Sequence, residues 1–117
     1  MSRSYSDVLL EVMLERASLL KSWRQLVKKA VDAIKEVCPE AHVYITGSIV
    51  KGEWIAASDI DLIIVLTREP DMREAARIIE HVWKKLGLLH THPLEIHVTG
   101  PEGLERYKRK GVLVQLA

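Results

Sequence analysis

Apolar residues recur at helical spacing over residues 5–37, where valine, leucine, isoleucine, alanine or tryptophan occupies every third or fourth position. This stripe predicts one long helix, or two helices with a break near Ser18 or Ser22. The helical segment should end at Cys38, because the residue before a proline such as Pro39 is pushed out of the helical region. A long N-terminal helical segment is therefore expected.

Two shorter helical stretches follow later in the chain. Asp71 can cap a helix over residues 72–86, and Gly87 is a typical stop signal. A last helix is predicted to begin at the turn formed by Gly100 and to run through Tyr107. These helices alternate with the strands predicted below.

Three segments rich in β-branched residues predict strands at residues 42–46, 59–67 and 93–99. The second is apolar on both faces, which is typical of a central, covered strand. Residues 112–116 could add a short strand or a tail. The resulting order of helix, strand, turn, strand, helix, strand and helix predicts an α/β layered domain.

Length and composition predict one ordinary globular domain spanning residues 1–117. Hydrophobic residues make up 48% and charged residues 28% of the chain. The net charge of +1 indicates no strong pull on nucleic acid, so direct nucleic-acid binding is not expected. The basic residues of the segment 106–110 are more typical of a solvated helix face than of a phosphate-binding patch.

Cysteine usage and hydropathy exclude several other classes of protein. Cys38 is the single cysteine, so neither an internal disulfide nor a Cys-x-x-Cys zinc site is available. The N-terminal residues lack the apolar core of a signal peptide, and no apolar run approaches the roughly 18 residues of a membrane span. We therefore expect a cytoplasmic protein that does not associate with a membrane.

The candidate chemistry lies at the start of the second predicted strand. Asp59 and Asp61 would share one face of that strand, with alpha carbons roughly 6.6 Å apart. Two carboxylates at this range repel each other unless a cation lies between them, and Mg²⁺ prefers such oxygen ligands. The preceding turn, Gly47 and Ser48, offers backbone N–H groups and a hydroxyl that can hold phosphate oxygens.

Together these residues read GS-x3-G-x5-SDIDL over positions 47–62. This pattern resembles the signature of the DNA polymerase beta nucleotidyltransferase superfamily and, more narrowly, the minimal nucleotidyltransferases of archaea and bacteria. The order of elements matches the family over about residues 25–100, with the motif core at 43–99. The resemblance implies a small mixed β-sheet flanked by helices, within the α/β (α+β) class, and two Mg²⁺ ions held by three carboxylates.

Two of the three carboxylates correspond to Asp59 and Asp61, and the third position to Glu95. Glu95 and His97 share one face of their predicted strand, opposite an apolar face. The family position is more often aspartate, so whether Glu95 or His97 completes the metal site is left open. On the phosphate side the candidates are Gly47, Ser48 and Ser58, together with Lys51, which lies in the same turn and could either neutralise phosphate charge or be a solvated lysine.

The implied activity is Mg²⁺-dependent transfer of a nucleoside monophosphate, with ATP as the expected donor, to a protein or small acceptor by a two-metal mechanism. An alternative follows from the same resemblance. Minimal members are often paired with a helical HEPN-type protein, and the chain could neutralise such a ribonuclease as an antitoxin, with catalysis secondary or absent. Acceptor, base preference and self-association are left open.

Three aromatic or imidazole side chains near the motif have simpler interpretations. His90 and His92 suggest a metal pair, but without a third ligand in sequence they are better explained as part of a loop. Trp54 could be a platform for a nucleobase, although covering the core is the favoured interpretation.

Overall fold

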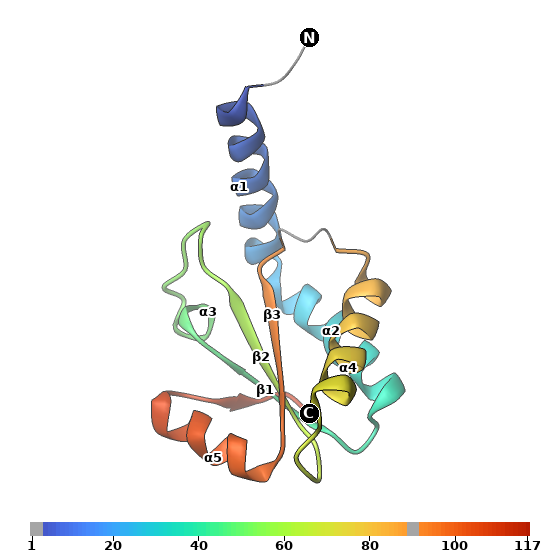
Figure 1. Ribbon diagram of the computed structural model, residues 1–117. Helices are drawn as coiled ribbons and strands as arrows, with labels where there is room; N and C mark the ends of the chain where they lie inside the picture. The colour runs from blue at the N-terminus through green and yellow to red at the C-terminus, as the bar shows by residue number, and fades with distance from the viewer. Residues whose placement is uncertain (1–3, 89–91) are drawn as a thin grey trace.

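The computed structural model describes residues 4–88 and 92–117 and shows a mixed α+β architecture (Figure 1). The elements are α1 (Tyr5–Lys21), α2 (Trp23–Val37), β1 (His42–Thr46), α3 (Ser48–Lys51), β2 (Ile60–Val65), α4 (Met72–Leu86), β3 (Leu94–Thr99), α5 (Pro101–Lys110) and β4 (Val114–Gln115). The predicted fold class and the long N-terminal helix are confirmed.

The four strands form one mixed sheet in the order β3-β2-β1-β4. β2 pairs parallel with β3 and antiparallel with β1, and β1 pairs antiparallel with β4. β2 is thus an inner strand, as its doubly apolar sequence predicts, and β3 is an edge strand. Five of the six residues of β2 are buried, Asp61 being the exception.

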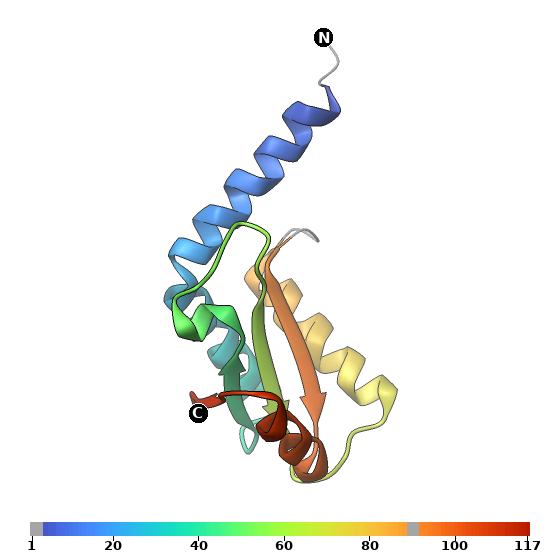
Figure 2. The ribbon, with the colours of Figure 1, turned by 90° about the vertical axis from the view of Figure 1, so that its left-hand side faces the viewer.

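Helices α2 and α4 pack together and cover one face of the sheet (Figures 1 and 2). Their buried side chains meet those of Leu62 and Ile64 from β2 in a single hydrophobic core. Asp61 and Ile63 point to the other face because side chains alternate along a strand. That second face is approached by α5 and the short α3, and the candidate chemistry lies on it.

Local sequence signals set the helix boundaries. The N-terminal helical segment breaks at Ser22, one of the two predicted positions, and Ser4 caps α1 through a reciprocal hydrogen-bonded box with Asp7. The Asp71 side chain accepts a hydrogen bond from the N–H of Glu74 at the start of α4. The predicted stop at Gly87 is also confirmed, since this glycine adopts the left-handed conformation.

Four predicted boundaries were wrong, two of them small: the second strand ends at Val65 and not at Thr67, and the third begins at Leu94 and not at Pro93. The second strand begins at Ile60, so Asp59 precedes it, because the pairing with β3 starts where Ile60 aligns with Leu94. The last helix continues to Lys110, three residues past the predicted Tyr107, and no proline or helix-stopping glycine interrupts it before Gly111.

Helix α1 projects away from the sheet (Figures 1 and 2). Its one buried residue is Leu20, near the end that joins α2. Several large apolar side chains towards the free end are exposed, namely Tyr5, Val8, Leu9, Leu10 and Leu14. A helix with so much apolar surface is usually covered on more than one side. Across the part of the chain that the structure describes, no helix has the length and apolar character of a membrane span.

Replacing Leu20 and Leu14 of α1 by alanine should have very different effects. Leu20 is fully buried, so Leu20→Ala should lower the free energy of unfolding by about 2–5 kcal/mol. Leu14 is 61% exposed, so Leu14→Ala should change it by less than about 0.5 kcal/mol. Urea denaturation followed by circular dichroism measures both, and equal losses would show that the free end of α1 is buried in solution.

Candidate active site

Three strands bring one residue each to a common row at one end of the sheet. Thr46 of β1 is aligned with Asp61 of β2, and Asp61 is aligned with Glu95 of β3. Aligned residues on neighbouring strands point to the same face, and strands lie about 4.8 Å apart. The row is therefore a compact line of polar side chains across one end of the sheet.

His97, two residues beyond Glu95 on β3, completes a cluster with the two carboxylates. Its Nε2 atom lies 3.4 Å from Oε1 of Glu95 and 3.8 Å from Oδ1 of Asp61. One ligand atom from each of the three residues lies within 4.8 Å of the others. Two carboxylates and an imidazole at this spacing are a donor set that a divalent cation can use.

The two acids raise the pKa of His97. The interaction of its imidazole with the Asp61 carboxylate, 3.8 Å away, is the main cause, partial burial opposes it, and Glu95 adds to the rise. Lys110 lowers the same pKa slightly, and the Tyr107 ring lies against the imidazole with centroids 5.7 Å apart. A protonated His97 would partly neutralise the acids while no metal is bound.

Gly47 brings the turn after β1 against Asp61. Its φ is +98°, a conformation that glycine adopts without strain, and a Cβ placed there would lie 2.6 Å from Oδ2 of Asp61. Ser48, the first residue of α3, is half-buried, and Lys51, the last, is exposed. The backbone of the predicted phosphate turn therefore touches the predicted metal ligand, and no side chain could be inserted between them.

Asp59 has a different environment from the one predicted. It lies outside β2, and its Oδ1 accepts a hydrogen bond of 3.0 Å from Nη2 of Arg16, in α1. Arg16 also donates to the carbonyl oxygens of Ala56 and Ser58, at 3.0 and 2.7 Å. The cluster found among residues 4–88 and 92–117 comprises Asp61, Glu95 and His97, without Asp59. The ligand role of Asp59 stays a prediction.

Ser58 shapes the loop in which it lies. Its hydroxyl oxygen accepts a hydrogen bond of 3.0 Å from the N–H of Ile55, and its own N–H donates to the Ile55 carbonyl. This pair closes a turn immediately before Asp59. In this conformation the Ser58 hydroxyl supports the loop, and its contact with phosphate stays a prediction.

Two other residues noted in the sequence, His92 and Trp54, make hydrogen-bonding or packing contacts within the fold. Nδ1 of His92 accepts a hydrogen bond from the N–H of Leu94, and its ring meets that of Trp83 edge to face at 5.2 Å. His90 lies outside the described residues. Trp54 packs against the core, in agreement with its interpretation as a cover.

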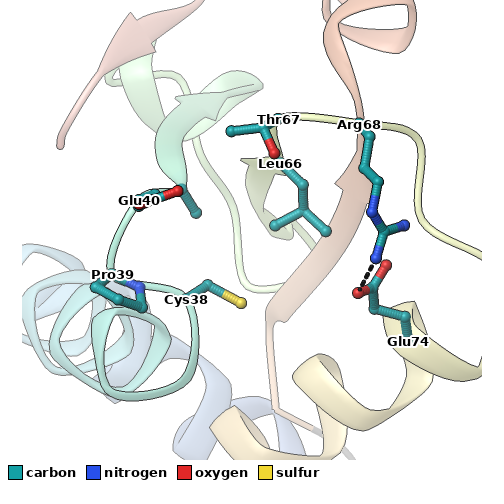
Figure 3. Close-up of a pocket in the computed structure, with 8 residues that line it drawn as sticks. Cys38, Pro39, Glu40, Leu66, Thr67, Arg68 and Glu74 are labelled. Atoms are coloured by element: carbon teal, nitrogen blue, oxygen red, sulfur yellow. Dashed lines mark hydrogen bonds and ion pairs between the residues drawn. The ribbon is translucent and has the colours of Figure 1, made fainter.

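One cavity lies far from the cluster of Asp61, Glu95 and His97, and another lies beside it. One of about 210 Å³ lies at the opposite end of β1 and β2, where Cys38 and the Arg68–Glu74 ion pair border it (Figure 3). Burial and the nearby Glu74 raise the pKa of the Cys38 thiol, which favours its protonated, unreactive form. The other, of about 420 Å³, is bordered by Asp59 and Glu95 and lies beside the candidate site.

Arg16 and Tyr107 were not predicted as neighbours of the site. Arg16 did leave a signal in the sequence, because it interrupts the apolar stripe of α1 between Val12 and Leu19. An arginine on such a face usually has a specific partner. Tyr107 left no signal, since its proximity to His97 depends on how α5 folds back over the sheet.

Comparisons with known proteins agree with this arrangement. No curated protein matches the sequence. The structure resembles the crystal structure of a proposed nucleotidyltransferase from Sulfolobus solfataricus, with a TM-score of 0.58 and 21% identity over 98% of this chain and 89% of the other. This likeness supports the fold. The family model of the nucleotidyltransferase domain matches residues 27–113, which include the whole row of site residues, and the chain therefore belongs to the nucleotidyltransferase domain family.

Proposed function

We propose that this chain transfers a nucleoside monophosphate from a nucleoside triphosphate, with ATP as the expected donor, to a protein or small acceptor. The observation that carries the proposal is the contact between Gly47 and Asp61, in the same row as Glu95. It joins a turn suited to phosphate oxygens to carboxylates suited to a metal ion. Family membership supports nucleotidyl transfer as the class of reaction.

The donor set fits Mg²⁺. Asp61 and Glu95 would hold it, with Asp59 or His97 completing the site; Asp59 is half exposed and would have to exchange its contact with Arg16. Bound there, Mg²⁺ would supply charge stabilisation for displacement at the α-phosphorus, and the family resemblance favours two ions. The longer side chain of Glu95 suits its exposed place on an edge strand, where it can reach towards Asp61.

The chain's own residues would position the donor. The backbone at Gly47 can approach the triphosphate closely, and the Ser48 hydroxyl can donate a hydrogen bond to it. Lys51, exposed at the end of α3, can neutralise phosphate charge. Asp61 and Glu95 would otherwise repel the triphosphate, so nucleotide and metal should bind together.

A second candidate function is supported by α1. Its exposed apolar side chains favour a protein partner, in line with an antitoxin that neutralises a HEPN-type ribonuclease by binding it. In that case the carboxylates would be secondary, and a variant that has lost metal binding would still neutralise its partner.

Asp61→Asn should abolish stabilisation by Mg²⁺ and ATP. A ligand at about 100 times its Kd stabilises the native state by roughly 2.7 kcal/mol, which is several degrees in Tm. Thermal unfolding of the wild type should show this rise only when metal and nucleotide are added together. The control Glu80→Gln, on the exposed face of α4, should respond like the wild type.

A panel of other triphosphates in the same assay identifies the base preference. If the wild type responds to no nucleotide, with or without Mg²⁺, the enzymatic proposal fails. If Asp61→Asn responds as strongly as the wild type, the candidate metal site is wrong.

Gly47→Ala should weaken metal and nucleotide binding far more than Gly52→Ala. Both glycines have positive φ, so alanine should strain either backbone by at least about 1 kcal/mol. Only at position 47 does the added Cβ meet Asp61, because nothing lies within 4 Å at position 52. Titration calorimetry with ATP and Mg²⁺ measures the difference, and equal losses would show that the contact with Asp61 is irrelevant to binding.

His97 should stabilise the metal-free protein more at low pH than at high pH. Its folded pKa is raised, so its contribution is fully present below the unfolded value of about 6.5 and is lost as the pH rises through the folded value. The free-energy difference between wild type and His97→Gln, measured by urea denaturation from pH 5 to 9, should therefore shrink as the pH rises. A difference that grows with pH would contradict the ion pairs with Asp61 and Glu95.

A further inference from the structure

One side of helix α1 carries a line of residues that begins with an acid, continues with apolar side chains and ends with a base. Its members, spaced by three or four positions, are Asp7, Leu10, Leu14, Ala17 and Lys21. Residues at this spacing follow one another along a single face of a helix, which we call the outer face of α1. Leu10 is 58% and Leu14 61% exposed, and both charged residues are exposed as well.

The described residues leave most of this outer face uncovered. α1 projects past the sheet (Figures 1 and 2), and the radius of gyration is 15.2 Å, against roughly 13 Å for a compact chain of this length. The contacts of α1 come from the Leu20 end and from the side of Arg16, which holds the loop before β2. Leucines in a line at helical spacing are usually covered by another element.

The charges at the two ends of the outer face are complementary to each other. Leu14 is the middle residue, because Asp7 precedes it and Lys21 follows it by the same number of positions. If a second copy of α1 lies antiparallel on the first, with the two-fold axis at Leu14, each Asp7 faces Lys21 of the other copy. Leu10 then faces the small residues Ala17 and Ser18, which leave room for it. The outer face is therefore self-complementary, as a two-fold dimer requires.

The same charges disfavour a parallel arrangement of the two helices. A parallel pair would set Asp7 against Asp7 and Lys21 against Lys21, and like charges in such contacts are destabilising. An antiparallel pair also keeps the two sheets apart, because each chain joins its sheet and remaining helices at the Lys21 end of α1 (Figure 1). The 17 residues of α1 span only roughly 26 Å, so the interface should be small and weak.

We infer that the outer face of α1 is a self-association surface, through which two copies of this chain pair antiparallel with Leu14 at the two-fold axis. The inference goes beyond the proposed function and does not rest on it. The dissociation constant of the dimer should be on the order of micromolar or weaker. The small effect of Leu14→Ala expected above applies to the unpaired chain, at protein concentrations well below that constant.

Sedimentation equilibrium over a range of protein concentrations measures the pairing. The wild type should approach twice the mass of one chain as the concentration rises. Leu14→Glu and Leu14→Lys should each stay monomeric, because a residue at the two-fold axis meets its own copy and like charges then face each other. The control Met72→Glu, at a position of α4 that is 90% exposed, should pair like the wild type. Circular dichroism should show the same helix content in all four proteins.

Mixing the two Leu14 variants separates self-pairing from binding to a different protein. An equimolar mixture of Leu14→Glu and Leu14→Lys should form the heterodimer, with a Kd at least about tenfold below that of either variant alone, and native mass spectrometry identifies it. The inference is overturned if the wild type stays monomeric at every concentration, if Leu14→Glu pairs like the wild type, or if the mixture pairs no better than its components. α1 would then be left to a partner of another sequence, such as a HEPN-type protein.

Lys21→Glu tests the antiparallel orientation. Lys21 is the better residue to change, because Oδ2 of Asp7 already accepts a hydrogen bond from the N–H of Ser4 in the cap of α1. In an antiparallel dimer the new glutamate faces Asp7, so the variant should pair several-fold more weakly than the wild type. In an equimolar mixture of the two, the wild-type homodimer should predominate. A predominant heterodimer would show parallel pairing and would contradict the inference.

Discussion

Parallel pairing of β2 with β3, in the register that sets Asp61 beside Glu95, places two negative charges on adjacent strands at the edge of a hydrophobic core. Carboxylates this close are unfavourable without a compensating charge. His97 supplies part of that compensation in the structure, and its raised pKa is the direct consequence. The strands themselves are held by the apolar face beneath, where Leu62 and Ile64 are fully buried. The core thus maintains an electrostatic arrangement that the polar groups alone would not adopt.

Gly47 extends this constraint to β1, the strand that it follows. Because a Cβ at this position would overlap Asp61, the chain can leave β1 beside the carboxylate only if the residue is glycine. The same close approach keeps the start of α3 within reach of anything bound by Asp61. On the opposite side, Arg16 fixes the loop before β2 with contacts to two carbonyl oxygens and to Asp59. The site is therefore bounded by the turn at Gly47 and by a loop that Arg16 of α1 holds.

Much of this arrangement could be predicted from local sequence. The alternation in β3 separates Glu95 and His97 from the buried Leu94 and Ile96, and the Asp71 cap and Gly87 stop mark the ends of α4. The start of β2 could not be predicted, because Asp59 continues the pattern of the strand, whereas the pairing with β3 begins only at Ile60. The cavity next to Trp83 was also invisible in the sequence, since its walls come from α4, β3 and the segments that flank them. Local pattern therefore predicts elements and faces, whereas long-range contacts decide which side chains meet.

Open sheets of parallel strands usually bind ligands at the carboxyl ends of their strands. Here Asp61 and Glu95 lie near the amino ends of β2 and β3, and the difference follows from β1. Because β1 runs antiparallel to β2, the carboxyl end of β1 and the turn at Gly47 lie at the same end of the sheet as the amino ends of β2 and β3. The carboxyl ends of β2 and β3 lie at the opposite end of the sheet. There Glu69 accepts hydrogen bonds from the N–H groups of Gly100 and Gly103 at the start of α5. One inverted strand thus brings the predicted phosphate turn, at the start of α3, to the same end of the sheet as the two carboxylates.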